Sequence, residues 1–281
     1  MALIAAEALA GRLADPQTVI GDVRWYLADP HQGRVEYERG HLPGARFVDL
    51  DTDLSVAEGP GRHPLPPVAV FCRTLGRMGI GPDHTVVAYD SSGGAIAARL
   101  WWMLDSIGHR SAFVLDGGYQ AWVEEGLPIT ASVPQPSPVD YPTSQEWRGV
   151  VNGDQVRSFL GRRTILDARS EDRYRGENET VDPRAGHIPT ARSAFFGKNL
   201  TPGGRFLPPE SLRLRYRELG VGESDTPVAY CGSGVTACHN LLALRLAGIP
   251  GDLYEGSWSD WSSSSDPLVA TGPRPGDAPP D

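Results

Sequence analysis

The sequence places one cysteine where a reactive thiolate is expected. An apolar run at residues 228–230 precedes Cys231 and an amphipathic run at residues 237–246 follows it, so we expect Cys231 where a buried strand turns into a helix. Glycines in the connecting loop allow backbone N–H groups to point inward, and the helix start adds partial positive charge. Both effects favour the ionised sulfur, so the pattern predicts a nucleophilic cysteine. The alternative is a small apolar cysteine packed in the core.

Two other kinds of anion-binding loop fit parts of the same stretch. Residues 232–237 match the G-x-G-x-x-A pattern of a dinucleotide site, with Asp252 following 20 residues after the first glycine. The acid of such a site follows the second strand, whereas Asp252 precedes the short apolar run at residues 253–254. A cysteine phosphatase would need an arginine six positions after the cysteine to bind phosphate, and that position is Ala237. The stretch therefore favours neither nicotinamide binding nor phosphate transfer.

Charge and composition exclude further classes of function. The 281 residues include 26 Lys and Arg against 35 Asp and Glu, a formal net charge of -9, which argues against binding to nucleic-acid backbones. The N-terminal segment lacks a basic region and Glu7 interrupts its apolar part, so we expect no signal peptide, no membrane-spanning helix and a cytoplasmic location. Three cysteines in so long a chain predict reduced thiols. Cys238, two helical turns after Cys231, is expected to pack in its helix.

The chain repeats one pattern of elements. Five landmarks occur in the same order in both halves: residues 18–24 and 164–169, 40–43 and 186–189, 65–67 and 207–209, 79–81 and 220–222, and 87–89 and 228–230. Self-similarity at this period indicates two copies of one domain. The proline-rich residues 132–138 lack periodicity and are typical of an extended linker. We therefore predict an N-terminal domain at residues 1–131, a linker at 132–146 and a C-terminal domain at 147–281.

Helical and strand patterns alternate in each half, and the strand patterns are continuously apolar, for example at residues 85–89. These patterns predict an α/β fold in which each copy has a mainly parallel sheet flanked by helices. Ligands of such sheets bind beyond the carboxyl ends of the strands, where Cys231 is expected. At the offset of 141 residues between Tyr89 and Tyr230, the counterpart of Cys231 is Asp90. A sulfur-based activity would therefore reside in the C-terminal copy.

Three motifs together resemble the two-domain rhodanese family of sulfurtransferases. They are Cys-Gly-Ser-Gly-Val-Thr-Ala at residues 231–237, Gly-His-Ile-Pro at 186–189 and Gly-Ser-Trp-Ser-Asp-Trp at 256–261. The resemblance covers nearly the whole chain and implies two tandem rhodanese-like domains, of which the N-terminal one lacks the cysteine. The neutral loop looks like that of the 3-mercaptopyruvate sulfurtransferases, whereas thiosulfate-preferring members usually carry basic residues after the cysteine. A donor with one carboxylate needs fewer cations than a dianion.

The resemblance implies ping-pong sulfur transfer through a persulfide on Cys231. The thiolate takes sulfur from 3-mercaptopyruvate, loop N–H groups stabilise the persulfide, and a thiol or cyanide acceptor removes the outer sulfur without a metal or organic cofactor. A thioredoxin-like reductant is a further expected partner. Thiosulfate:cyanide sulfurtransferase is the alternative within the family. A module that carries or senses persulfide for a protein partner is the alternative from another class.

The resemblance also implies which residues bind the donor. Arg173 matches the arginine that binds the donor's carboxylate, and Arg184 would be the second such arginine, although the intervening segment is longer than expected for the family. For both arginines the alternative is a solvated basic surface or a structural ion pair. Four loop residues complete the predicted binding site: Gly232, Gly234, Val235 and Thr236.

A proton relay is the last expectation from the resemblance. His41 and the loop residue Ser233 are its predicted members, with Asp29 as a third, and the relay would supply the proton that an enolate leaving group requires. The alternative for His41 is that it braces its Gly-His-x-Pro turn. We expect this structural role for its repeat counterpart, His187.

Overall fold

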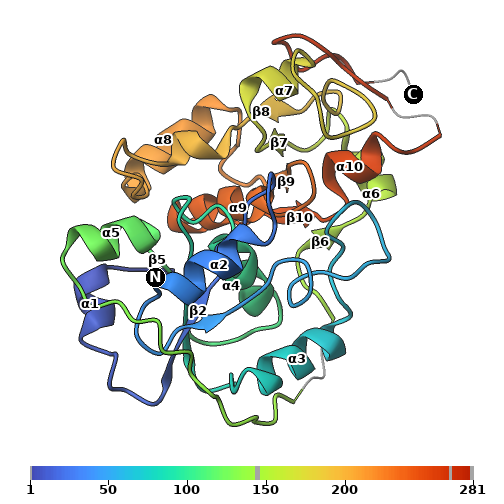
Figure 1. Ribbon diagram of the computed structural model, residues 1–281. Coiled ribbons are helices and arrows are strands. Elements are labelled where there is room, and N and C mark those ends of the chain that lie inside the picture. Colours follow the sequence, from blue (N-terminus) through green and yellow to red (C-terminus); the bar gives the residue numbers. More distant parts are fainter. Residues whose placement is uncertain (1, 143–145, 266–267, 279–281) are drawn as a thin grey trace. The chain divides into compact units, whose positions relative to one another are not determined.

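The computed structural model describes residues 2–142, 146–265 and 268–278, which divide into two compact units (Figure 1). Unit 1 comprises Met1–Val56, Pro66–Arg148 and Pro202–Phe206, and unit 2 comprises Ala57–Leu65, Gly149–Thr201 and Leu207–Asp281. Each half of the chain therefore contributes one short segment to the unit formed mainly by the other half. The domain boundaries at residues 131 and 147 stay predictions.

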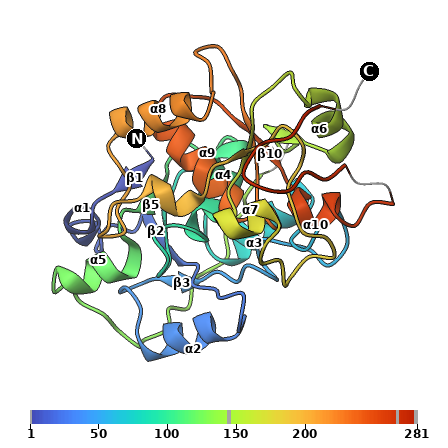
Figure 2. The same cartoon turned by 90° about the horizontal axis from the view of Figure 1, so that it is seen from above.

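Unit 1 is built on a five-stranded parallel sheet in the order β1-β5-β4-β2-β3. Its strands are β1 (Leu3–Ile4), β2 (Thr18–Asp22), β3 (Arg46–Phe47), β4 (Thr85–Tyr89) and β5 (Ala112–Leu115). Figure 2 shows β1 beside β5, where Leu3 pairs with Val114. Four of the five residues of β4 are buried, which explains why the strand expected at residues 85–89 is apolar throughout.

The helices of unit 1 follow its strands in the chain. They are α1 (Ala6–Ala10), α2 (Gln32–Arg39), α3 (Val68–Arg77), α4 (Ala97–Ser106) and α5 (Gly118–Glu124). Helix α4 packs on β4 and β5. The core cluster of this unit joins Leu9 of α1, Val87 of β4 and Trp122 of α5, and the indole of Trp122 donates to the carbonyl of Pro128 at 2.8 Å.

Unit 2 repeats this architecture strand for strand. Its parallel sheet has the order β6-β10-β9-β7-β8, with β6 (Val150–Val151), β7 (Ile165–Asp167), β8 (Arg192–Ser193), β9 (Val228–Tyr230) and β10 (Asp252–Tyr254). The helices are α6 (Gly153–Phe159), α7 (Glu171–Arg175), η1 (Phe196–Asn199), α8 (Pro209–Glu218), α9 (Thr236–Leu246) and α10 (Ser257–Trp261). Two copies of an α/β unit with a parallel sheet confirm the predicted fold class. No described helix is long and apolar enough to cross a membrane.

A buried ion pair supports the end of one strand in each unit. Arg24 binds Asp22 with Nε at 3.0 Å and Nη2 at 2.6 Å, and Arg169 binds Asp167 with the same two nitrogens at 3.1 Å and 2.7 Å. Nη2 of Arg169 also donates to the carbonyl of Gly186 at 2.7 Å. The side chains of both pairs are at most 3% exposed. These pairs hold the Gly-His-x-Pro turns against the sheets.

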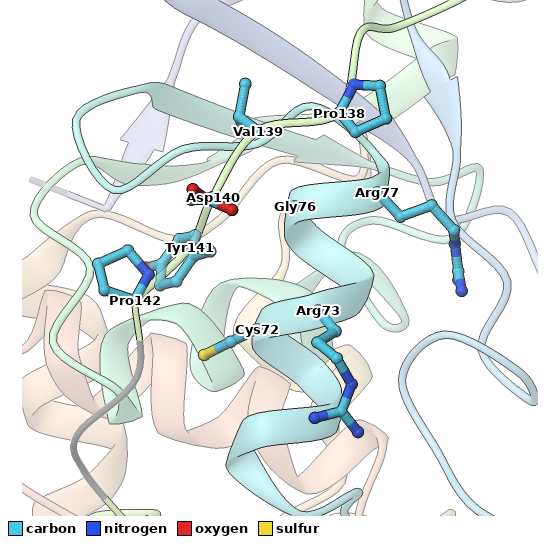
Figure 3. Close-up of a pocket in the computed structure, with 9 residues that line it drawn as sticks. All are labelled: Cys72, Arg73, Gly76, Arg77, Pro138, Val139, Asp140, Tyr141 and Pro142. Atoms are coloured by element: carbon cyan, nitrogen blue, oxygen red, sulfur yellow. The ribbon is translucent and has the colours of Figure 1, made fainter.

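A hollow of about 630 Å³ lies in unit 1 between α3 and residues 138–142 (Figure 3). Cys72 extends from α3 on the side of Tyr141, and it is 2% exposed, as expected for a core cysteine. The chain passes close to the helix here, because a Cβ atom on Gly76 would lie 2.4 Å from the carbonyl oxygen of Val139. The predicted linker therefore packs on α3 in part, while its residues 143–145 lie outside the described residues.

Candidate active site

Cys231 lies directly after β9 and is 2% exposed. Its N–H donates to Ser257 Oγ at 3.1 Å, and its carbonyl accepts from the N–H of Trp258 at 2.9 Å. Ser257 has a φ of 54°, which places it in the sparsely populated left-handed region, and its Oγ donates to the carbonyl of Tyr254 at 2.9 Å. The beginning of α10 therefore fixes the backbone of the cysteine.

The loop between β9 and α9 contains all the predicted loop residues. Gly234 has a φ of 77°, which favours glycine, and Val235 precedes the first turn of α9, which begins at Thr236. The carbonyl of Gly232 accepts from the N–H of Ser259 at 2.9 Å. The structure thus brings these residues together beside the cysteine, and their contact with a substrate stays a prediction.

The corresponding loop of unit 1 shows what such a loop binds. Asp90, the repeat counterpart of Cys231, follows β4 and is 1% exposed. Its carboxylate accepts four hydrogen bonds of 2.8 or 2.9 Å, from the backbone N–H groups of Ser92, Gly94, Ile96 and Ala97. The loop therefore forms an anion cradle, which a carboxylate of the chain itself fills.

Unit 2 presents the same cradle with a cysteine in place of the acid. At the offset of 141 residues, three of the four donors correspond to the N–H groups of Ser233, Val235 and Ala237, and no described residue accepts a hydrogen bond from them. The fourth corresponds to Cys238, whose N–H donates to the carbonyl of Val235 at 3.0 Å. The three remaining N–H groups would stabilise negative charge on the sulfur of Cys231.

The three cysteines are free thiols and all are buried. Cys238 is 0% exposed inside α9, and its Sγ donates to the carbonyl of Gly234 at 3.3 Å. This packed position is the one expected for Cys238. Only Cys231 among the three follows a strand of the sheet directly, at the carboxyl end where ligands bind in parallel α/β folds.

Arg173 lies on α7 beside the loop. A Cβ atom built on Gly232 would lie 3.6 Å from Nη1 of Arg173. The other two nitrogens are held by acids: Nε and Nη2 bind Glu179 at 3.0 Å and 2.9 Å, and Nη2 binds Asp182 at 2.9 Å. The structure therefore places the predicted carboxylate-binding arginine next to the residue that follows the cysteine. Its binding of a donor stays a prediction.

Arg184 has a different environment. Its residue is exposed, and its carbonyl accepts from the indole N–H of Trp258 at 2.9 Å. Among the described residues, none forms a hydrogen bond or an ion pair with its guanidinium group. The structure therefore does not bring the Arg184 side chain into contact with Arg173 or with the loop, and its predicted role in donor binding is not supported by a contact.

His41 belongs to unit 1, where it is 0% exposed. Its Nδ1 lies 2.7 Å from the carbonyl oxygen of Tyr37 and its Nε2 lies 3.2 Å from that of Ser132, and its ring stacks on Tyr37 at 4.0 Å. His187 repeats this arrangement in unit 2, with Nδ1 2.8 Å from a carbonyl oxygen and its ring stacked on a tyrosine at 3.8 Å. Both histidines occupy the bracing position of a Gly-His-x-Pro turn. Asp29, the predicted third relay member, accepts from the N–H of His31 at 3.0 Å.

Ser233 contacts a histidine that the sequence analysis did not single out. The Oγ of Ser233 lies 2.7 Å from Nδ1 of His63, and both residues are less than 9% exposed. His63 has no histidine counterpart in the second copy, where Phe206 stands before the repeated Leu-Pro-Pro, whereas His41 is repeated as His187. That lack of repetition was the available signal, because residues that serve the shared architecture recur in both copies.

Residues 57–65 carry His63 into unit 2 and are anchored there. The N–H of Arg62 donates to Ser259 Oγ at 3.1 Å, and the N–H of Leu65 donates to Glu255 Oε2 at 3.1 Å. Gly61 has a φ of 75°, and a Cβ atom on it would lie 2.4 Å from the carbonyl oxygen of Gly256. Glycine is therefore required at position 61 for the segment to approach α10.

Gly61→Ala should displace this segment and lower sulfur-transfer activity by about tenfold or more, since the added Cβ atom meets backbone that cannot yield easily. Gly44→Ala is the matched control, because Gly44 has a φ of 76° and a Cβ atom there would meet nothing within 4 Å. Both variants carry the backbone strain of about 1 kcal/mol, but only Gly61→Ala carries the clash. Steady-state kinetics and thermal unfolding of both variants check this. Equal activities would contradict a role for the anchored segment.

Burial and ion pairing act in opposite directions on the two acids beside Arg173. Burial raises the pKa of Glu179, but the N–H groups of Val181 and Asp182 and the Arg173 guanidinium outweigh it, so this pKa lies below its ordinary value. For Asp182, burial outweighs the attraction of Arg62 and Arg173, and the pKa is raised. Glu179 therefore keeps its negative charge to lower pH than Asp182 does, and it is the more constant anchor of Arg173.

Comparisons with known proteins agree with the resemblance seen in the motifs. The family model described as a rhodanese-like domain matches residues 5–125 and again residues 153–264. A protein of Pseudomonas aeruginosa named "Probable 3-mercaptopyruvate sulfurtransferase" is 46% identical over 96% of this chain and 98% of its own length. The thiosulfate sulfurtransferase of Mus musculus is 36% identical over 92% of this chain and 89% of its own length.

A solved structure is similar over almost the whole fold. SseA from Escherichia coli, from a study of the rhodanese fold and mechanism of 3-mercaptopyruvate sulfotransferases, has a TM-score of 0.82 and 29% identity, over 92% of this chain and 98% of its own. The two matches to the family model coincide with the two parallel sheets described above. The chain therefore belongs to the rhodanese-like family and contains two copies of its domain.

Proposed function

We propose that this protein is a sulfurtransferase that moves a sulfur atom from 3-mercaptopyruvate to a thiol or cyanide through a persulfide on Cys231. One observation carries the proposal: Cys231 stands at the position where, in unit 1, four N–H groups bind the carboxylate of Asp90. A loop built to hold an anion stabilises a thiolate before the reaction and a persulfide after it. The sulfurtransferase names of the relatives support the same reaction class.

The reaction proceeds in two half-reactions. The thiolate of Cys231 attacks the thiol sulfur of the donor, so that an S–S bond forms and the donor's C–S bond breaks. The electron pair of that bond moves into the enolate of pyruvate, which then takes a proton and leaves as pyruvate. In the second half-reaction, an acceptor thiolate attacks the outer sulfur and leaves with it, which regenerates the Cys231 thiolate. No electrons are supplied from outside, so the chemistry requires neither a metal nor an organic cofactor.

Ser233 and His63 supply the proton transfer in this proposal. Their 2.7 Å contact is short enough for a proton to move between Oγ and Nδ1, and the serine lies two residues after the cysteine. This assignment gives the histidine role of the predicted relay to His63 in preference to His41. A hydroxyl that receives its proton from a histidine can protonate the enolate as it forms.

The donor is chosen by the charge around Gly232. The loop side chains themselves are neutral, and the cation Arg173 lies beside Gly232 with two of its nitrogens held by acids. One carboxylate suits this limited positive charge better than the dianion thiosulfate does. Thiosulfate remains the second candidate donor, favoured by the mouse relative that carries its name.

Initial rates with the two donors test the choice. With cyanide as the common acceptor, we expect kcat/KM for 3-mercaptopyruvate to exceed that for thiosulfate by about tenfold or more, because each unsatisfied charge in a partly buried site costs about 1 kcal/mol or more. Pyruvate and thiocyanate are measured in parallel. A preference for thiosulfate would assign the chain to the other donor class. Persulfide formation without turnover on any small acceptor would instead support a carrier of sulfur for a protein partner.

The acceptor and the location follow from the same chemistry. A persulfide is released by attack of a thiolate, so a small thiol or a thioredoxin-like protein is the proposed natural acceptor. The cysteines are free thiols, which agrees with the proposed location in the reducing cytoplasm.

A further inference from the structure

Arg62 places its guanidinium group beside the active loop. It belongs to the anchored segment Ala57–Leu65 of unit 2, and its Nη2 would lie 2.9 Å from a Cβ atom built on Gly232. Arg173 approaches the same Cβ position with Nη1 at 3.6 Å. Two cations from distant parts of the sequence therefore meet at the residue that follows Cys231.

The nitrogen atoms of Arg62 are unequally occupied. Nη1 forms an ion pair with Asp182. Nε is buried and has no hydrogen-bond partner among the described residues, and Nη2 takes part in no described hydrogen bond. A buried N–H without a partner costs free energy, so a site of this kind is completed when an acceptor binds.

The unoccupied edge of Arg62 is the one that binds carboxylates elsewhere in this chain. Arg24 and Arg169 each use Nε together with Nη2 to hold the two oxygens of a buried aspartate. This edge presents two parallel N–H groups, which match the spacing of carboxylate oxygens. In Arg173 the same edge is already filled by Glu179, which leaves only Nη1 free.

Asp182 fixes the two guanidinium groups relative to each other. One of its oxygens binds Nη1 of Arg62, and the other binds Nη2 of Arg173 at 2.9 Å. Its side chain is 1% exposed, so this bridge is shielded from water. The bridge orients the free nitrogens of both arginines toward Gly232, which prepares the site for an anion before any donor arrives.

We infer that Arg62 is the second carboxylate-binding residue of the donor site, the role that the resemblance gave to Arg184. Its Nε and Nη2 form the two-pronged contact to the carboxylate of a 2-oxo acid, and Nη1 of Arg173 adds a single hydrogen bond. In 3-mercaptopyruvate only two carbon atoms separate the reacting sulfur from the carboxylate carbon. A carboxylate site must therefore lie next to the residue that carries the nucleophile, and Gly232 is that neighbour. This inference rests on the proposed function.

Paired donors test the inference. We would compare 3-mercaptopyruvate with mercaptoacetone, a ketone donor that lacks the carboxylate, on the intact protein and on Arg62→Gln. Arg62→Gln should lower kcat/KM for 3-mercaptopyruvate by about 10- to 100-fold, chiefly through KM, and should change that for mercaptoacetone by less than about threefold. Arg62→Lys should give an intermediate loss, because it keeps the charge and loses the fork.

Arg217→Gln is the matched control. Arg217 lies on α8 in the same unit, its side chain is 55% exposed, and it pairs with Glu223 at 2.9 Å on the surface. It should change neither donor's kinetics. Arg184→Gln is tested beside it, because a loss confined to Arg184→Gln and to 3-mercaptopyruvate would overturn the inference.

The outcomes separate this inference from the proposed function. A merely structural role of Arg62 would lower the rates of both donors equally, and that result would also overturn the inference. If the intact protein transfers sulfur from 3-mercaptopyruvate and Arg62→Gln is unaffected, the inference alone fails. If the intact protein uses neither donor, the proposed function fails and the inference fails with it.

Discussion

Cys231→Ser should abolish sulfur transfer, lowering kcat with 3-mercaptopyruvate by about 10⁴-fold or more. The serine hydroxyl fits the same buried position, but it stays protonated at neutral pH and its oxygen cannot accept a sulfane sulfur. The loop, the anchored segment and the arginines remain in place, so the loss reports on the nucleophile itself. Release of pyruvate with a thiol acceptor measures it.

Cys238→Ala controls for a general effect of removing a thiol. Cys238 is 0% exposed and its thiol donates within α9, so its removal costs packing and one weak hydrogen bond. We expect it to lower the free energy of unfolding by about 1 kcal/mol and to leave kcat within about threefold. Full activity in Cys231→Ser, or an equal loss in Cys238→Ala, would contradict the assignment of the nucleophile.

His63→Gln should lower kcat by about 10²- to 10³-fold, since glutamine fills the space but cannot exchange a proton with Ser233. Ser233→Ala should have an effect of similar size. Because the two residues act as one unit, the double variant should be little worse than either single one. Steady-state rates of the three variants give the coupling directly.

His31→Ala is the control for the relay, as His31 is exposed in unit 1, and it should leave kcat unchanged. His41→Gln distinguishes the sequence-based relay from the structure-based one. Its carbonyl partners indicate that the loss should appear in stability rather than in kcat. A loss of kcat in His41→Gln, together with an active His63→Gln, would return the relay to His41.

The regular elements were accessible from the sequence because their patterns are local. Continuous apolar runs at residues 85–89 and 228–230 became β4 and β9, since strands of a parallel sheet are buried on both faces. The turn after each run follows from its glycines, and the position of Cys231 follows from the turn. The repeat supplied the rest, because the same offset that aligns the strands also aligns Cys231 with Asp90.

The relay histidine was not accessible in this way. Residues 57–65 contain two glycines and two prolines and show no periodicity, so no local rule places them. Their position depends on contacts with residues far along the chain, such as the pair of His63 and Ser233, which are 170 residues apart. Arg62 escaped notice for the same reason. Its neighbours Gly232 and Asp182 can be recognised only in the folded unit.

Asp90 gave more from the structure than from the sequence. The sequence shows only that an acid replaces the cysteine in the first copy. The structure shows that this acid fills the anion cradle with four N–H contacts, and it thereby reveals what the second loop can stabilise. The inactive copy thus serves as an internal model of the occupied active loop.

The central claim is that Cys231 carries the transferred sulfur, and the mass of the intact protein tests it most directly. After brief incubation with 3-mercaptopyruvate and removal of the donor, the protein should be heavier by one sulfur atom, with the added atom on the peptide that contains Cys231. Cyanide should then return the mass to its starting value, and Cys231→Ser should gain nothing. An unchanged mass with both 3-mercaptopyruvate and thiosulfate, or an added sulfur on Cys72 or Cys238, would contradict the account.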